Sequence, residues 1–260
     1  MKLCEAIQKI EAVIPPAWAE EWDNPGLTVG DPSANIFNIA LALDVTPQTV
    51  SDAISKDCQL LLTHHPAIFH PVKSIINERP VPKAIIEAIK NGLALYAAHT
   101  NWDYAENGVN MILANLLSLK NIYPLVPSKN DNGAWGLGAV GELNEPLDLC
   151  ECVALLKERW QSSILRAYGN MSHVVKKIAI GGGACGDLWP AAFYSGAELF
   201  ITADVAYHNR QDMLGMGLNC IVVDHGEMER LSIPALASVG ESATGLTTHI
   251  LDEIKVDWAV

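Results

Sequence analysis

The sequence predicts an α/β fold made of two similar, interlocked lobes that are related by an internal duplication. Short apolar runs typical of buried strands alternate with segments whose apolar residues recur at a helical period. Strands that alternate with helices imply a mostly parallel sheet with helices packed on it. The order of these segments in the first half of the chain also recurs in the second half.

The first half begins with a predicted helix over residues 3–13, followed by the Pro- and Gly-containing loop EEWDNPGLTVGDP. Pro47 suits the first turn of one later helix, and Gly92 suits the end of another. Three buried strands and the two helices between them are expected over residues 37–46 (strand), 47–58 (helix), 59–65 (strand), 81–92 (helix) and 93–103 (strand).

The second half repeats this order with a strand over 175–186 that enters a glycine loop, a helix over 187–197 and a strand over 198–204. With a constant offset of 139 residues, Leu60 falls on Leu199 and His65 falls on Asp204. Separately, residues 92–103 line up with residues 217–229 after a slip of one residue, so that His99 falls on His225 and Asp103 falls on Glu229. We therefore expect a first lobe over 1–126 and a second over 127–235, with 236–260 able to return to the first.

Charge and composition narrow the class of protein. The net charge of −13 and the absence of any basic patch argue against nucleic acid as a partner, because phosphate binding needs clustered Lys and Arg. No stretch resembles a signal peptide or a membrane span, so we expect a cytoplasmic protein. The six cysteines match no zinc-ligand spacing and are expected to be reduced thiols.

Five polar residues stand at the ends of equivalent strands and form the candidate metal site: His64, His65, Asp103, His225 and Glu229. Each has a plainer interpretation on its own. A histidine can be a surface residue or a hydrogen-bonded core residue, Asp103 can cap the helix that begins near residue 104, and His225 and Glu229 can lie in a solvated turn. One shared metal site explains all five together, at the carboxyl edge of the strands where α/β sheets usually bind ligands.

Three imidazoles and two carboxylates suit zinc, manganese, iron or nickel. Five ligands exceed what one tetrahedral catalytic zinc takes, but they suffice for two divalent ions about 3.5 Å apart. Such a pair lowers the pKa of bound water and polarises a carbonyl or phosphoryl oxygen. The chemistry implied is hydrolysis of a small-molecule substrate, with no organic cofactor.

The stretch GGGACG at residues 181–186 offers a competing interpretation, because it fits G-x-G-x-x-G after a strand. The helix that follows is short and contains Pro190. A dinucleotide site needs an acidic partner about 20 residues further on, but Glu198 comes too early and Asp204 ends the following strand and not the usual one. A plainer role for these glycines is close approach of the backbone beside the metal site, or to a substrate phosphate.

Several motifs together resemble the NIF-three-like family, the GTP cyclohydrolase type-two homologues, over nearly the whole chain: EWDNPGL, LLTHHP, AAHTNWD, ITADVAYH and DHGEME. The resemblance implies two α/β lobes, a dinuclear metal centre in the cleft between them, and a ring-shaped hexamer. It implies that the five candidate residues are the metal ligands, with Glu229 bridging. His99, Asp204 and His208 would then orient ligands or carry protons, and His70 has no counterpart.

The sequence also departs from the family pattern at Glu227, where the family often carries an apolar or small polar residue. Only the short stretch 128–146 stands at the junction of the expected lobes, so the inserted domain of longer members is not expected. The function predicted is a divalent-metal-dependent hydrolase acting on a nucleotide-like or heterocyclic substrate, which for the cyclohydrolase label means opening of the guanine imidazole ring. The alternative is a metal-handling or adaptor protein without turnover. Without the resemblance, a dimer would be the expected oligomer.

Overall fold

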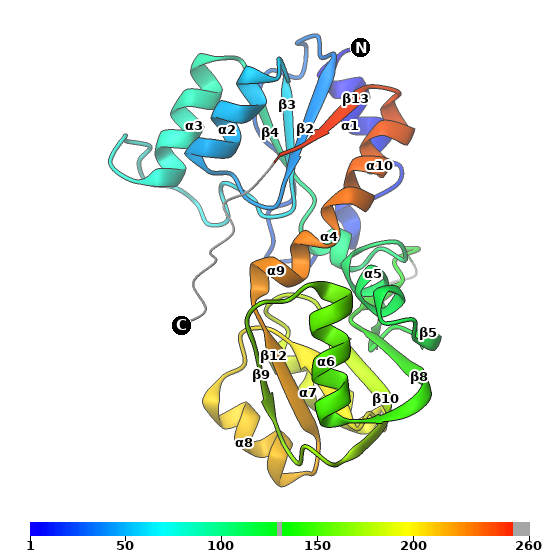
Figure 1. Ribbon diagram of the computed structural model, residues 1–260. Coiled ribbons are helices and arrows are strands. Elements are labelled where there is room, and N and C mark those ends of the chain that lie inside the picture. Colours follow the sequence, from blue (N-terminus) through cyan, green and yellow to red (C-terminus); the bar gives the residue numbers. More distant parts are fainter. Residues whose placement is uncertain (129–131, 252–260) are drawn as a thin grey trace. The chain divides into compact units, whose positions relative to one another are not determined.

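The computed structural model describes residues 1–128 and 132–251, and each of its two compact units is a β-sheet covered by helices (Figure 1). The first unit contains Met1–Trp102 and the segment that begins at Ile233, and the second contains Asp103–Ser232. The boundary falls inside the short helix α4 (Thr100–Asp103). The expected mixed α/β class is therefore confirmed.

The first unit has a five-stranded sheet in the order β1-β4-β3-β2-β13. Its strands are β1 (Gly26–Val29), β2 (Asn38–Ala42), β3 (Leu60–Thr63), β4 (Ala94–Ala97) and β13 (Thr247–Ile250). Neighbours from β13 to β4 are parallel, and β1 is antiparallel to β4. Helices α2 (Pro47–Ser55) and α3 (Pro80–Lys90) cover one face, and α1 (Leu3–Glu11) and α10 (Ile233–Thr244) cover the other (Figure 1).

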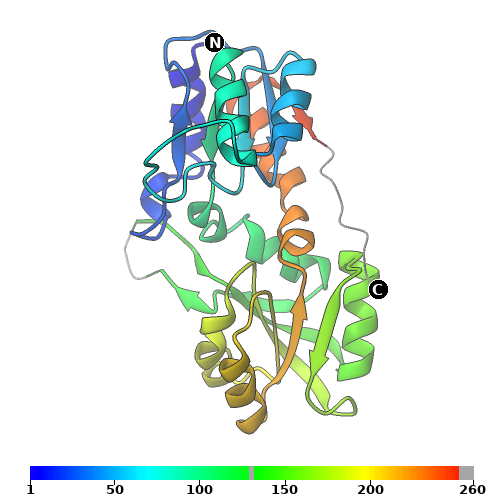
Figure 2. The ribbon, with the colours of Figure 1, turned by 90° about the vertical axis from the view of Figure 1, so that its left-hand side faces the viewer.

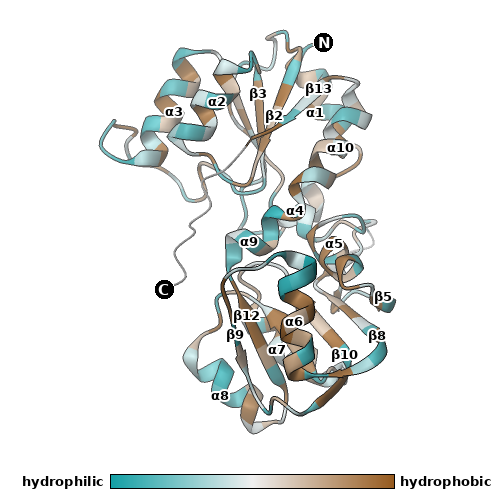
Figure 3. Ribbon diagram, viewed as in Figure 1, coloured by the Kyte–Doolittle hydropathy of each residue, from teal (hydrophilic) through white to brown (hydrophobic). Residues whose placement is uncertain are grey.

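Local sequence explains these elements. All four residues of β3 and of β4 are buried, as expected for strands covered by helices on both faces. Helix α2 begins at Pro47 behind Thr46, whose side chain accepts a hydrogen bond from the Thr49 amide, so the first turn is capped. Figure 3 shows the corresponding pattern, with hydrophobic colour along the strands of the sheets.

The second unit has a six-stranded sheet in the order β5-β8-β10-β11-β12-β9. Its strands are β5 (Lys120–Tyr123), β8 (Ala139–Asp148), β9 (Leu165–Tyr168), β10 (Val174–Gly181), β11 (Leu199–Thr202) and β12 (Asn219–Val223). Helices α5 (Val109–Leu116) and α6 (Leu149–Trp160) pack on one face, and α7 (Trp189–Tyr194) and α8 (Tyr207–Gly215) on the other (Figure 2). The short α9 (His225–Arg230) follows β12.

The second sheet differs from the expected mostly parallel arrangement. Only β10, β11 and β12 pair in parallel, and they are flanked by the antiparallel strands β8 and β9. Strand β8 comes from residues 128–146 and their neighbours, which the sequence presented only as a connection. That stretch also supplies β7 (Gly136–Leu137), which pairs with β6 (Val126–Pro127). Its glycines and polar residues concealed the strand pattern.

Strands β2 and β3 of the first unit pair in the register that corresponds to that of β10 and β11 in the second unit. In the first unit Ile39 pairs with Leu60, and in the second Ile178 pairs with Leu199, which are the residues 139 positions further on. Thr63 and Thr202 end the middle strand in each case. The candidate residues follow the carboxyl ends of these strands and therefore lie at one edge of each sheet.

Two further observations concern the described residues only. No helix among them is long and apolar enough to cross a membrane. All six cysteines lie in this part of the chain and are free thiols.

Candidate metal-binding residues

Three imidazoles meet at the carboxyl edge of the first sheet. His64 and His65 follow β3, and His99 follows β4. Their ring centroids lie 5.1 Å (His64–His65), 5.3 Å (His64–His99) and 5.7 Å (His65–His99) apart, and one ring nitrogen of each lies within 4.8 Å of the others. The sequence predicted His64 and His65 as ligands and His99 as a neighbouring proton carrier; the structure brings all three into one cluster.

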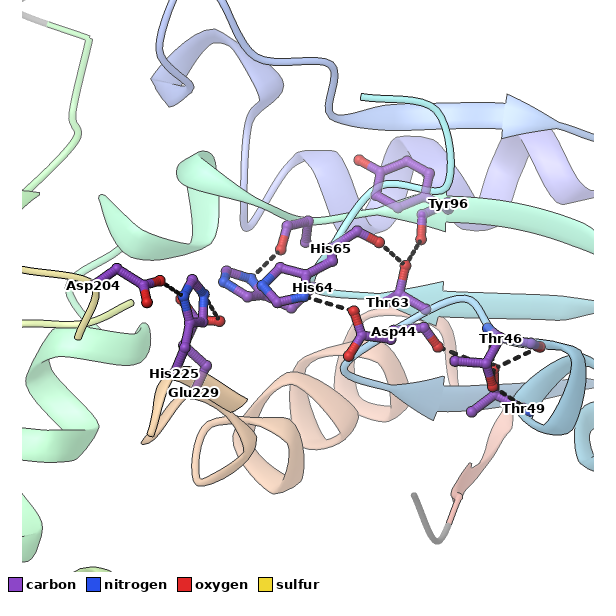
Figure 4. Close-up of polar contacts among 11 residues, drawn as sticks. Asp44, Thr46, Thr49, Thr63, His64, His65, Tyr96, Asp204, His225 and Glu229 are labelled. Carbon is purple, nitrogen blue, oxygen red and sulfur yellow. Dashed lines mark hydrogen bonds and ion pairs between the residues drawn. The ribbon is translucent and has the colours of Figure 1, made fainter. Parts of the chain in front are cut away.

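The Nδ1 atom of each ring is held by an oxygen atom of the same unit. His64 Nδ1 lies 2.8 Å from the Ala98 carbonyl oxygen, and His65 Nδ1 lies 2.8 Å from Asp44 Oδ1 (Figure 4). A carbonyl oxygen can only accept, so His64 Nδ1 is the donor and a neutral ring then carries its lone pair on Nε2. An imidazole fixed in this way is the usual form of a metal-ligating histidine.

Asp23 holds His99 in the same manner and is a residue that the sequence did not single out. Its buried carboxylate lies 2.7 Å from His99 Nδ1 and also accepts hydrogen bonds from the Thr100 amide (3.0 Å) and hydroxyl (2.5 Å). Burial raises the pKa of Asp23, but these hydrogen bonds and the charge of His99 outweigh it and bring the pKa to about 2. Burial lowers the pKa of His99, which Asp23 partly offsets.

Asp44, the partner of His65, was also not predicted as a site residue, although it lies two residues beyond the carboxyl end of β2. A signal was present in both cases. Asp23 lies in the motif EWDNPGL, and Asp44 stands at the same end of its strand as His64 and His99 stand on theirs. A polar residue at the carboxyl end of each of three neighbouring strands is the pattern that would have found Asp44.

The second unit carries an imidazole between two carboxylates. His225, the first residue of α9, has Nδ1 2.6 Å from Asp204 Oδ2 and Nε2 2.9 Å from Glu229 Oε2 (Figure 4). Glu229 is buried, so the solvated-turn interpretation fails for it. Asp224 caps α9 by accepting a hydrogen bond from the Glu227 amide. Asp204 follows β11 in the left-handed region (φ 51°), which turns its carboxylate toward His225.

The glycine loop packs closely against these residues. Gly183 has φ +70°, and a Cβ atom there would overlap the Glu229 carboxylate. A Cβ atom on Gly182 would lie 2.7 Å from Val109 Cγ1. The Gly182 amide donates to Asn110 Oδ1 (2.8 Å), and Asn110 Nδ2 donates to the Asp103 carbonyl (3.1 Å). These contacts account for the glycines by protein packing, without a dinucleotide.

The remaining predicted residues occupy distinct positions. Asp103 is buried on α4, and it does not cap the next helix, because Gly108 is the N-cap of α5. His208 is exposed on α8, with its ring 5.3 Å from that of Tyr207. Neither residue belongs to the histidine and carboxylate groups that come within ligand distance among the described residues.

Glu227, the departure from the family pattern, binds a loop and not the candidate metal ligands. Its carboxylate accepts hydrogen bonds from the Ser162 hydroxyl, from the Ser163 amide and hydroxyl, and from the Ile164 amide. Burial raises its pKa, but these hydrogen bonds bring the pKa below its ordinary value. Glu227 therefore ties α9 to the segment that precedes β9.

The side chains fit a divalent metal ion of the borderline class. Imidazole nitrogens with fixed Nδ1 atoms and a buried carboxylate are the donors that zinc, manganese, iron and nickel accept. The two groups differ in composition, since the first unit offers imidazoles and the second adds a carboxylate to its imidazole.

The fold and these histidines define an α/β protein with a candidate divalent-metal site. Comparison with known proteins gives its family. The Duf34/NIF3 (NGG1p interacting factor 3) family model matches residues 1–254, so the chain belongs to that family and the resemblance seen in the sequence is confirmed. A Clostridium perfringens protein named "GTP cyclohydrolase 1 type 2 homolog" is 38% identical over 93% of this chain and 90% of its own length. A Drosophila melanogaster protein named "NIF3-like protein 1" is 29% identical over 88% of this chain and 78% of its own.

Solved structures agree with the fold. A Bacillus cereus protein related to NIF3 superposes with a TM-score of 0.92, covering 100% of this chain and 99% of its own at 22% identity. Reduced HcgD from Methanocaldococcus jannaschii superposes with a TM-score of 0.79 over 97% of this chain and 98% of its own, at 26% identity.

Proposed function

We propose that this protein is a divalent-metal-dependent hydrolase with a dinuclear centre, acting on a small nucleotide-like or heterocyclic substrate. The ligands are His64, His65, Asp103, His225 and Glu229. The observation that carries the proposal is the cluster of imidazoles at two strand ends, with every Nδ1 atom held by an oxygen atom. Metal-ligating histidines almost always have their other ring nitrogen held in this way.

Two zinc, manganese, iron or nickel ions, when bound, would supply Lewis acidity and activated water for hydrolysis. The chain's own residues then have separate roles. Ala98 O and Asp44 orient His64 and His65, and Asp204 orients His225. His99, held by Asp23 beside these rings, is placed to take up and release a proton. His208 is kept as a second candidate for proton transfer.

The proposal assigns both groups of residues to one centre, in a cleft between interlocked lobes related by internal duplication. The corresponding strand registers support the duplication, because Ile39–Leu60 and Ile178–Leu199 pair alike. Chemistry supports the shared centre, since a dinuclear site with a bridging carboxylate needs both the imidazoles of the first unit and Glu229. The names of the relatives support a GTP cyclohydrolase-like substrate. A cytoplasmic location and a homohexamer belong to the same proposal.

The test measures metal content and turnover of the purified protein and of two ligand variants, His65→Ala and Glu229→Ala. Each is expected to lower the bound metal by mass spectrometry and to reduce hydrolysis of nucleotides or phosphoesters at least 100-fold. His249→Ala on β13 and Glu158→Ala on α6 are matched controls with wild-type behaviour. In a shared centre, each ligand variant weakens the binding of both ions. If each variant lost one ion and bound the other as the wild-type protein does, the result would contradict a shared centre. Turnover that survives both variants would defeat the hydrolase proposal.

A non-catalytic metal-handling or adaptor protein is the second candidate, favoured by the same donor set, which binds metal whether or not turnover follows. Tight metal binding without hydrolysis across that screen would select it. Molar mass from light scattering tests the hexamer in the same samples.

A further inference from the structure

Two large aromatic side chains stand in the open beside His99. Trp22 is 59% exposed and Phe69 is 37% exposed. Their rings lie 5.8 Å apart at 70°, so they form a corner. His99 contacts both, with centroid distances of 6.4 Å to Trp22 and 5.9 Å to Phe69. Exposed aromatic rings that border a polar functional cluster are a common lining of ligand sites.

The corner is held in place by hydrogen bonds on both sides. Asp23 and the Glu20 amide bind Thr100, which anchors the segment that carries Trp22. Asn24 Nδ2 donates to the Ile68 carbonyl at 2.6 Å and so joins this segment to the one that carries Phe69. The two rings are therefore presented by backbone that is already fixed, which lowers the entropic cost of binding.

We infer that Trp22 and Phe69 form a subsite for a planar heteroaromatic ring of the substrate. A ring that stacks on one side chain points its edge at the face of the other, and both stacked and edge-to-face contacts are favoured geometries for aromatic groups. The face of any nucleobase suits such a corner, and the contact needs no charge on the ligand. His99 closes the corner on the side of the imidazole cluster. The inference rests on the proposed function only for the reaction that follows; binding of the ring itself needs no metal.

The experiment compares guanosine monophosphate with ribose 5-phosphate, which carries the same sugar and phosphate without the ring. Calorimetric titration of the full chain is done with EDTA and again with zinc. Trp22→Ala and Phe69→Ala should each weaken binding of guanosine monophosphate about tenfold, and Trp22→Phe should retain most of it. Phe37→Ala is the matched control, because Phe37 is 64% exposed and precedes β2, at the opposite end of the same sheet. Ribose 5-phosphate should bind all variants alike.

Several results would overturn the subsite. These are equal affinity of the wild-type protein for both compounds, unchanged affinity for guanosine monophosphate in both alanine variants, or a changed oligomeric state with unchanged affinity, which would assign the rings to a subunit contact. The outcome is separable from that of the proposed function. Ring-dependent binding by the wild-type protein that hydrolyses no compound of the screen with zinc bound would support the subsite and reject the hydrolase. Metal-dependent turnover whose KM is unchanged in Trp22→Ala and Phe69→Ala would support the hydrolase and reject the subsite.

Discussion

The two units hold an imidazole against an aspartate in nearly the same way but in opposite surroundings. His99 lies 2.7 Å from Asp23 in the first unit, and His225 lies 2.6 Å from Asp204 in the second. The Asp23 side chain is 0% exposed, whereas that of Asp204 is 61% exposed. A buried carboxylate must satisfy its oxygens within the protein, so Asp23 also binds Thr100 and is part of the fold. An exposed one is solvated and can orient its histidine at little structural cost.

In the second unit the backbone at Gly183 packs closely against Glu229. Substitution of this glycine is expected to cause the largest loss of stability. Gly183→Ala places a methyl group against the Glu229 carboxylate and forces a non-glycine residue into φ +70°. We expect the free energy of unfolding to fall by about 1–2 kcal/mol because of the backbone conformation and by a further ~1–3 kcal/mol because of the overlap. Urea unfolding of the metal-free protein measures the sum, and calorimetry measures the metal affinity, which should fall with it.

Gly196→Ala is the control for this change. Gly196 has φ +78°, yet a Cβ atom there would meet only Lys177 Nζ at 4.0 Å. It should therefore lose only the backbone contribution and keep its metal affinity. Equal losses in the two variants would show that Glu229 yields freely and that the second unit is not held by this contact.

A direct test of the comparison is the pair Asp23→Asn and Asp204→Asn. The amide group of the first variant can accept the Thr100 hydrogen bonds with its oxygen only by turning its NH2 group toward the protonated His99 Nδ1. It therefore cannot satisfy both partners as the carboxylate does, and we expect a loss of about 1–3 kcal/mol in the free energy of unfolding. The second variant removes an exposed ion pair and should change stability by less than about 1 kcal/mol. Similar values for both would remove the distinction between the units.

The contribution of Asp23 to stability should depend on pH in a defined direction. The pKa of Asp23 falls from 3.8 to about 2 on folding, so its ionised form stabilises the folded state by about 2 kcal/mol above pH 3.8. That contribution is lost as the pH falls through 3.8 toward 2. The stability gap between the wild-type protein and Asp23→Asn should therefore narrow over this interval. A gap that stays constant would place its cause in packing instead of charge.

A small effect is also expected at Glu227, which neighbours the candidate ligands in sequence but binds a loop. Glu227→Ala removes the acceptor of the Ser162, Ser163 and Ile164 groups, and partial exposure lets water replace some of these bonds. We expect a loss of about 1 kcal/mol in urea unfolding, with metal content unchanged. A large loss of metal would instead show that the loop positions α9 for ligation.

Much of the fold was predictable because strand and helix periods are local. The runs over 59–65 and 198–204 became β3 and β11, with ends within two residues of the predicted ones. The stretch 128–146 was not, since strand β8 obtains its stability from pairing with β5 and β10 and has little apolar signal of its own at its far end. His64, His65, His225 and Glu229 were recognisable by residue type and strand position.

Residue types and their periods alone predict the class of fold, the strand ends that bear the polar residues, and a candidate set of donor residues. The tertiary structure decides which nitrogen of each histidine is engaged and which carboxylate engages it. Asp23 lies 76 residues before His99 and Asp44 lies 21 before His65. Such partners have no fixed spacing in the chain. Asp44 meets His65 because parallel pairing of β2 and β3 brings their carboxyl ends to one edge of the sheet. Asp23 meets His99 because β1 pairs antiparallel with β4, which places the start of β1 beside the carboxyl end of β4.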